Sequence, residues 1–232
     1  VDVTLDIYPY DYWHSGLSVL WPERNFDNRD VAEFILAHLT TPSNLRLVSY
    51  PPEPSLAGKT IADIAKQKGA DPVTVLMDLA HRASDEGSGA RILSTSMDER
   101  DMIELMNWPY ANFCSDGALK GSHPRGAGAF PRVLGRYVRD LKALPLTQAI
   151  YKMTGLSARH MGIGNRGFIR PGAKADLVLF DPATVKDNAT VENNTALASG
   201  ILKTWVNGIL VYADGKATGA RPGQVIRRET KS

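Results

Sequence analysis

A carboxylate and a guanidinium lie nine residues apart in the segment 113–132 and could act together on a substrate. Asp116 is the middle residue of Ser-Asp-Gly (115–117), and Arg125 ends His-Pro-Arg (123–125). A carboxylate can serve as a general base or metal ligand, and an arginine can bind a substrate carboxylate through two parallel hydrogen bonds. Ser-Asp-Gly is also a common turn sequence. These residues alone therefore favour a simpler interpretation, in which Asp116 only stabilises a turn and Arg125 is a surface charge.

The elements around these residues predict where the pair lies in a fold. Strands are predicted at 1–7, 45–49, 91–95 and 110–115, and amphipathic helices lie between and after them. Such alternation indicates βα units with a parallel sheet. Asp116 then follows a strand at its carboxyl end, where barrel enzymes carry their catalytic residues. The segment 11–28 has no clear periodicity and is predicted to be a long loop.

The pattern changes near residue 160. The segments 175–181, 205–212 and 225–227 resemble strands, and Asn207-Gly208 between apolar runs predicts a hairpin. We therefore predict an α/β part over 1–160 and a β-rich domain over 161–232. Without this tail, the length fits three or four βα units at ~30 residues each.

Composition excludes several classes of protein. The 232 residues are 43% hydrophobic and 22% charged with a net charge of +2, so neither nucleic acid nor a membrane is the expected partner. One cysteine cannot form an internal disulfide. No apolar run approaches the ~18 residues of a membrane span, and no signal-peptide pattern is present, so we expect a cytoplasmic protein. The chain begins with Val1 inside a predicted strand, as expected for a fragment or a processed subunit.

Several motifs carry a resemblance to a known family. They are Asp-Ile-Tyr-Pro-Tyr (6–10), Ser-Asp-Gly (115–117), His-Pro-Arg (123–125), Phe-Pro-Arg-Val-Leu-Gly (130–135), Arg-Pro-Gly-Ala-Lys-Ala-Asp-Leu-Val (170–178), Trp-Val-Asn-Gly (205–208) and Thr-Gly-Ala-Arg-Pro-Gly (218–223). Together they resemble the C-terminal half of the N-acyl-D-amino-acid deacylases (D-aminoacylases) of the amidohydrolase superfamily. The Pro-Gly-x-x-Ala-Asp-Leu run identifies the superfamily, and the His-Pro-Arg and Phe-Pro-Arg blocks narrow it to these deacylases.

The resemblance implies a fold and an activity. The fold is α/β: the C-terminal part of a (β/α)8 TIM-like hydrolase barrel, with the C-terminal part of a small β-sandwich domain. The activity is hydrolysis of N-acyl-(D-)amino acids to a carboxylate and a free amino acid. Asp116 matches the family's general base, which also contacts the metal. Arg125 and Tyr8 match residues that bind the substrate carboxylate, and Met97 matches one that lines a substrate pocket. His14 and Ser15 lie where the family has further substrate contacts, although the local pattern departs there.

The resemblance also implies one or two divalent ions, with zinc expected. The family's His-x-His is missing, because the five histidines stand at 14, 38, 81, 123 and 160. One carboxylate cannot hold a catalytic zinc, which needs about three protein ligands. We therefore expect the other ligands to lie outside this chain, on an N-terminal half that acts as its partner. Without that half the chain should be inactive.

Some alternatives stay open. A related hydrolase could open a cyclic amide, an imide or a lactone with the same aspartate, and a non-catalytic subunit could only stabilise a partner. His123 either contacts the active site or shapes the turn before Pro124. Cys114 is interpreted as a small buried residue rather than a nucleophile, and Arg132 as either a surface charge or a support for the site.

Overall fold

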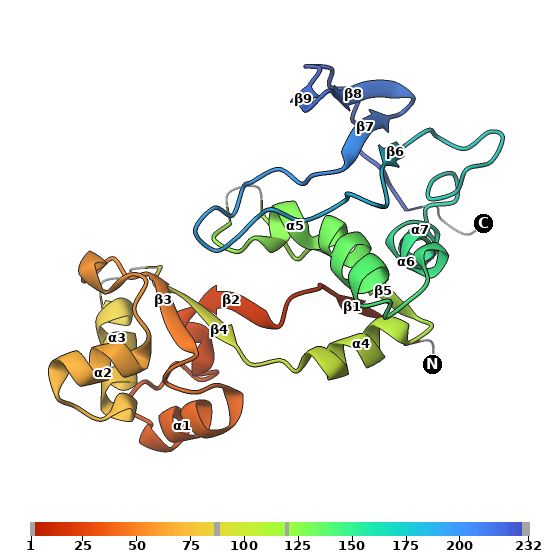
Figure 1. Ribbon diagram of the computed structural model, residues 1–232. Coiled ribbons are helices and arrows are strands. Elements are labelled where there is room, and N and C mark those ends of the chain that lie inside the picture. The colour runs from red at the N-terminus through yellow and green to blue at the C-terminus, as the bar shows by residue number, and fades with distance from the viewer. Residues whose placement is uncertain (1–2, 86–88, 119–120, 229–232) are drawn as a thin grey trace. The chain divides into compact units, whose positions relative to one another are not determined.

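The computed structural model describes residues 3–85, 89–118 and 121–228, and shows mixed α and β structure (Figure 1). The chain divides into two compact units, each described here by itself. The first unit comprises residues 1–10 and 99–232, and the second comprises residues 11–98. The boundary predicted near residue 160 lies within the first unit and stays a prediction. In the described part of the chain, no helix is long and apolar enough to cross a membrane.

The first unit is organised around a pair of parallel strands, β1 (Leu5–Ile7) and β5 (Ala111–Phe113). The strand predicted at 1–7 is thus observed over its second half, and residues 1 and 2 lie outside the described ranges. Helix α4 (Glu99–Asn107) precedes β5, so β1, α4 and β5 form a βαβ unit. The expectation of three or four such units is wrong for the described residues, because these two strands are their one parallel pair.

Four helical segments follow the candidate site turn. They are α5 (Arg125–Arg132), its π-helical continuation η4 (Val133–Asp140), α6 (Leu146–Met153) and α7 (Gly155–Met161). The buried residues of these two segments are Arg125, Gly128 and Ala129 of α5 and Val133, Leu134, Gly135 and Tyr137 of η4, whereas Phe130 is exposed. The buried amine of Lys152 ties α6 to the start of β5 by donating to the carbonyl oxygens of Trp108 and, at 3.1 Å, Ala111.

The tail of the first unit is a four-stranded antiparallel sheet in the order β6 (Leu177–Phe180), β7 (Ile201–Val206), β8 (Ile209–Ala213) and β9 (Lys216–Ala217). The predicted hairpin is confirmed, since Asn207 and Gly208 have φ of 51° and 81° and join β7 to β8. The strand predicted at 225–227 is wrong, because this segment pairs with no described strand.

The second unit contains an antiparallel sheet in the order β2 (Tyr12–Gly16), β4 (Arg91–Thr95) and β3 (Leu45–Ser49). The predicted strands 45–49 and 91–95 are observed, but the parallel arrangement expected for them is wrong. The long loop predicted at 11–28 is also wrong, because it contains β2 and the 3-10 helix η1 (Leu17–Leu20). The remaining helices are α1 (Arg29–Phe34), η2 (Ile35–Leu39), η3 (Pro54–Leu56), α2 (Ile61–Lys68) and α3 (Pro72–Asp85).

The two ends of the second unit lie beside each other. The backbone nitrogens of Ser96 and Met97 donate to the carbonyl oxygen of Asp11 at 3.2 and 3.1 Å, and Tyr12 pairs with Thr95 in the β2–β4 ladder. A unit whose ends are adjacent can be inserted into another fold without spreading the host strands. The second unit is therefore an insertion between β1 and α4.

Candidate functional site

Asp116 and Arg125 form an ion pair in the first unit. Nη2 of Arg125 lies 2.6 Å from Oδ2 of Asp116, and its Nε donates to the Asp116 carbonyl oxygen at 2.7 Å. The Arg125 side chain is 10% exposed, whereas that of Asp116 is 61% exposed. The interpretation of Arg125 as a surface charge is therefore wrong. Its guanidinium is held beneath a carboxylate that faces solvent.

Glycines bring these two residues together. Asp116 has a φ of 43°, a left-handed conformation that aspartate tolerates better than most residues. A Cβ on Gly117 would lie 2.4 Å from Cα of Gly126, and one on Gly126 would lie 2.8 Å from the Ala118 carbonyl oxygen. Any side chain at either position would separate the segment after β5 from the first turn of α5. Residues 115–117 form no regular turn, and the left-handed Asp116 together with the close approach of Gly117 to Gly126 places Asp116 beside Arg125.

Tyr8 completes the group of predicted residues in the first unit. It directly follows β1, and Asp116 lies three residues after β5, so both stand at the carboxyl ends of parallel strands. The Arg125 guanidinium carbon lies 4.7 Å from the Tyr8 ring centroid, a cation–π distance. Burial, opposed by Arg125 and reinforced by Asp116, raises the pKa of the Tyr8 phenol. Tyr8 therefore keeps its proton at neutral pH and can donate a hydrogen bond to an anion.

The other predicted substrate residues lie in the second unit. His14 and Ser15 belong to β2 and pair with Leu93 and Ile92 of β4, so the loop expected at this position is a strand. Met97 lies two residues after β4, and its backbone nitrogen donates to the carbonyl oxygen of Asp11. As substrate contacts, these three residues stay predictions.

His123 is buried next to Arg125 and bonds to its backbone. Its side chain is buried, and Nδ1 accepts a hydrogen bond from the backbone nitrogen of Arg125 at 3.0 Å. The expectation that His123 shapes the turn at Pro124 is confirmed by this bond. The ring lies edge-on to the rings of Tyr8 and Tyr10, with centroid distances of 6.1 and 5.1 Å. Tyr10 was missed from the sequence, although Tyr-Pro-Tyr at 8–10 places two aromatic rings on one short turn.

Arg132 anchors the same turn from the other side. Its Nε donates to the Pro9 carbonyl oxygen at 2.7 Å, and its guanidinium carbon lies 4.7 Å from the Tyr10 ring centroid. Nη1 pairs with Asp187 at 3.2 Å. Of the two interpretations of Arg132, support for the site is thus the one that its contacts favour.

The Amidohydrolase family profile matches residues 45–212, which is more than half of the chain. The chain belongs to this family. It is 37% identical over 229 residues to D-aminoacylase and 36% identical over 231 residues to N-acyl-D-glutamate deacylase, both of Alcaligenes xylosoxydans xylosoxydans. These matches cover 98% and 99% of this chain, which spans 42% of the length of each relative, their C-terminal part. The resemblance seen in the sequence motifs is thus confirmed.

A solved amidohydrolase structure agrees with this assignment. N-acyl-D-glutamate deacylase from Bordetella bronchiseptica, complexed with zinc and a phosphonate inhibitor that mimics the tetrahedral intermediate, superposes with a TM-score of 0.77. The sequences are 38% identical, and the match covers 98% of this chain and 43% of that one. The mixed α and β structure is therefore that of an amidohydrolase.

The described residues of this amidohydrolase chain do not provide enough ligands for a complete metal site. No group of three or more His, Cys, Asp or Glu side chains there could hold a metal ion. Asp116 fits the part of a single carboxylate ligand, because it is exposed, but its Oδ2 is engaged by Arg125. Cys114 is half-buried, and burial raises the pKa of its thiol, which disfavours the thiolate needed for metal binding or nucleophilic attack.

Proposed function

We propose that this chain is the C-terminal part of a metal-dependent amidohydrolase that hydrolyses N-acyl-D-amino acids to a carboxylate and a free amino acid. The observation that carries the proposal is the Asp116–Arg125 pair beneath Tyr8, at the carboxyl ends of β1 and β5. A general base beside a carboxylate-binding arginine is what an enzyme needs to hydrolyse an amide next to an acid group. The similarity to D-aminoacylase supports the same substrate class.

Each residue of the cluster has a distinct task in this proposal. Asp116 takes a proton from the attacking water and delivers it to the leaving nitrogen. Arg125 and Tyr8 bind the substrate carboxylate through the guanidinium and the protonated phenol, which fixes the amide relative to Asp116. Zinc, when bound, lowers the pKa of its water to about 7. Met97, His14 and Ser15 remain candidates for contacts to the rest of the substrate.

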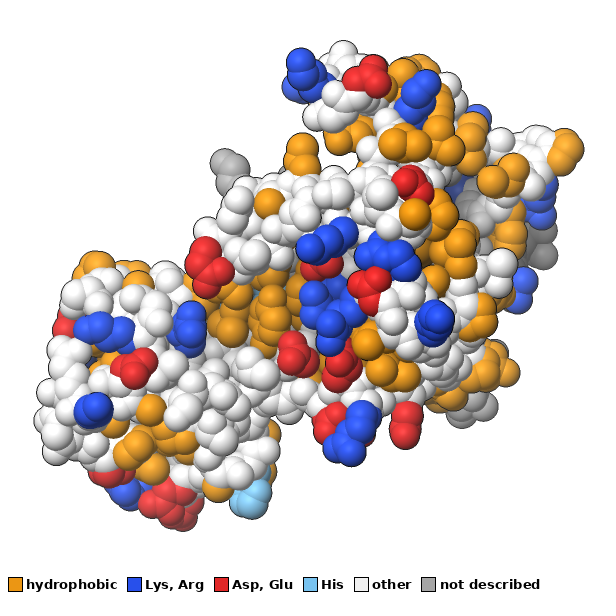
Figure 2. All heavy atoms as spheres, viewed as in Figure 1, with side chains coloured by type: hydrophobic (Ala, Val, Ile, Leu, Met, Phe, Trp, Pro, Cys, Tyr) orange, Lys and Arg blue, Asp and Glu red, His pale blue; other side chains and the backbone are white. Residues whose placement is uncertain are grey.

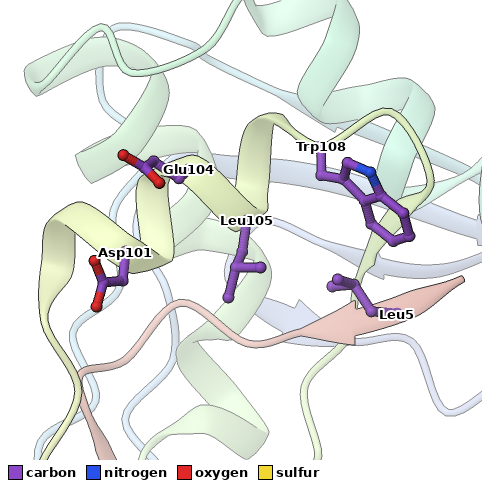
Figure 3. A pocket seen from close by; sticks show the side chains of 5 residues that line it. All are labelled: Leu5, Asp101, Glu104, Leu105 and Trp108. Carbon is purple, nitrogen blue, oxygen red and sulfur yellow. The ribbon is translucent and has the colours of Figure 1, made fainter.

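The barrel is part of the proposal. We assign β1 and β5 to the last strands of a (β/α)8 barrel, with residues 1–160 as the barrel portion interrupted by the second unit. Residues 161–232 are assigned to the small β domain. Two surfaces of the first unit support the presence of more chain. One is a pocket of about 480 Å³ beside β1 and α4, where Leu5, Leu105 and Trp108 point toward one another (Figure 3). Asp101 and Glu104 also line this pocket.

The tail sheet is the second such surface. Figure 2 shows hydrophobic side chains gathered over this sheet, and those exposed on it are Leu177, Val178, Leu179, Leu202 and Ile209. An exposed apolar patch on a folded unit is typical of a surface that contacts another protein segment, a ligand or a membrane. We assign that role to the N-terminal half, which would also supply the remaining metal ligands.

The test uses the complete enzyme, in which Asp116→Asn removes the base but keeps the size of the side chain. We expect hydrolysis of N-acyl-D-amino acids to fall at least a thousandfold, while the metal content by elemental analysis stays within a factor of two. The matched control is Asp140→Asn, an exposed carboxylate that also pairs with an arginine, and it should keep the wild-type rate. A near-wild-type rate for Asp116→Asn would overturn the assignment. Hydrolysis confined to cyclic amides would overturn the substrate class.

A further inference from the structure

We infer that His123 is the positioning residue of the carboxylate-binding site: its Nδ1 fixes the backbone of Arg125, and its ring fixes Tyr8. This inference rests on the proposed function of Arg125. It adds a residue that touches no substrate and acts through the two side chains that do. The bond to Arg125 and the ring contacts to Tyr8 and Tyr10 carry it.

The start of α5 lacks the usual side-chain cap. The first N–H groups of a helix have no partner within the helix and are usually satisfied by the side chain of the capping residue. Here the capping residue is Pro124, and it makes no side-chain capping bond. The N–H of Arg125, the first residue of α5, is instead satisfied by Nδ1 of His123. His123 therefore fixes the backbone position from which the Arg125 side chain extends.

The hydrogen bond from the Arg125 N–H requires one tautomer of the His123 ring. An imidazole nitrogen that accepts a hydrogen bond carries no proton, so the neutral ring of His123 is protonated on Nε2. The ring is 4% exposed. A buried ring with one nitrogen committed to the backbone has a single orientation available.

The His123 ring contacts the Tyr8 ring directly. The His123 ring meets the Tyr8 ring at 71° and the Tyr10 ring at 86°, both edge-to-face arrangements. The two tyrosines flank Pro9 on the turn after β1. His123 thus joins the turn that carries Tyr8 to the helix that begins with Arg125. A shift of its ring would change the spacing of both carboxylate-binding groups.

Two substitutions distinguish the role of the Nδ1 acceptor of His123 from the role of its aromatic ring. His123→Asn keeps an acceptor at the place of Nδ1 and removes most of the ring, and His123→Phe keeps an aromatic ring and removes the acceptor. In the complete enzyme we expect His123→Phe to raise KM about tenfold for an N-acetyl-D-amino acid, with kcat changed less than threefold, because a binding interaction is lost. His123→Asn should recover most of the KM.

Two substrates, one with and one without a carboxylate, distinguish a role in positioning Arg125 from a general loss of structure. The same variants are assayed on the C-terminal carboxamide of that N-acetyl-D-amino acid, which has no carboxylate for Arg125 to bind. His123→Phe should change KM for the carboxamide less than twofold. An equal rise in KM for acid and carboxamide would overturn the inference. His81→Asn, a change at a histidine paired with Asp27 in the second unit, is the control and should leave both KM values unchanged.

A measurement without substrate keeps the inference separate from the proposed function. Amide hydrogen exchange at Arg125 should be at least tenfold faster in His123→Phe than in wild type and should be restored in His123→Asn. Unchanged exchange at Arg125 in His123→Phe overturns the inference whatever the enzyme hydrolyses. Absence of N-acyl-D-amino-acid hydrolysis in the wild type, with exchange behaving as expected, overturns the proposed function alone.

Discussion

The two units of this chain differ in how they bury apolar surface. The second unit encloses a core of its own, to which β3, β4 and the helices contribute buried residues such as Leu47, Ile64 and Ile92, while the half-buried Trp13 of β2 packs against it. Among its described residues, the large hydrophobic side chains that are exposed are Val19, Phe34 and Leu39. The first unit instead exposes the apolar residues of β6, β7 and β8. The first unit, which contains the candidate site, thus leaves more of its apolar surface exposed than the second unit does.

The first unit compensates with polar anchors and close backbone approaches. Arg132 and Arg139 on the helix formed by α5 and η4 bond to Asp187 and to the Val185 carbonyl oxygen. A Cβ on Gly135 would lie 2.7 Å from that same oxygen. The segment after β6 is therefore attached to the helix by a few specific contacts. Such contacts specify position, while an apolar core supplies most of the free energy of folding.

Separating the units gives the largest expected effect. Residues 11–98 expressed alone should unfold in one cooperative thermal transition, with a free energy of unfolding on the order of 5 kcal/mol, because their core and their sheet are self-contained. Residues 1–10 joined to 99–232 by a short Gly-Ser linker, which keeps the β1–β5 pair, should bind a hydrophobic dye and melt without a sharp transition. Circular dichroism and dye fluorescence measure both proteins. A sharp transition for the linked first unit, or none for residues 11–98, would contradict the comparison.

A pair of identical substitutions gives the next largest effect. Ile64→Ala in the second unit removes a fully buried side chain and should lower the free energy of unfolding by about 2–5 kcal/mol. Ile209→Ala is the matched change in β8 of the first unit. Its side chain is 51% exposed, so the loss should be ~0.5 kcal/mol or less. Denaturant titrations of this chain measure both values.

The same pair tests the proposed partner. In a protein that includes the N-terminal half, Ile209→Ala should cost more than it does in this chain, because the sheet face would then be covered. An equal cost in the two contexts would argue against a covering segment. A cost for Ile209→Ala in this chain that matches Ile64→Ala would show that the apolar face is already buried.

The fold could be predicted from the sequence where the signal is local. The strands 45–49 and 91–95 and the Asn207-Gly208 turn each depend on a few neighbouring residues, and all are confirmed. The arrangement of these strands could not be predicted in the same way. β2 pairs with a strand about 80 residues further along the chain, and no short pattern specifies a partner at that distance.

The candidate site divides in the same way. Asp116 and Arg125 are close in sequence, and Gly117 between them permits the close backbone approach that brings them together. Tyr8 came from the family resemblance, because β1 and β5 are separated by the whole inserted unit. The bond from Arg125 to His123 depends on Pro124 at the capping position, where a side-chain acceptor would ordinarily stand.

A smaller effect is expected at the start of α2 in the second unit. Thr60 and Asp63 form a capping box in which each side chain accepts from the other's backbone nitrogen, both at 3.1 Å. Thr60→Ala removes one acceptor and should cost about 1 kcal/mol. Thr60→Ser keeps the hydroxyl and should cost a few tenths at most. Urea denaturation of residues 11–98 compares them, and equal losses for the two variants would rule out a capping contribution.

The smallest effect is a pH dependence in the first unit, at the bidentate pair of Glu99 and Arg136, whose two contacts are both 2.8 Å. Hydrogen bonds from Arg136, opposed by burial, hold the pKa of Glu99 below its usual range. The folded pKa is the lower one, so the stabilisation is present above the unfolded value of about 4.3 and is lost as pH falls through the folded pKa. The side chains are 35% and 40% exposed, so screening limits the loss to tenths of a kcal/mol. Between pH 7 and pH 3, Glu99→Gln should lose that much less free energy of unfolding than wild type, as urea titrations at the two pH values would measure. An equal loss in the two proteins would show that the Glu99–Arg136 pair adds no pH-dependent stability to the first unit.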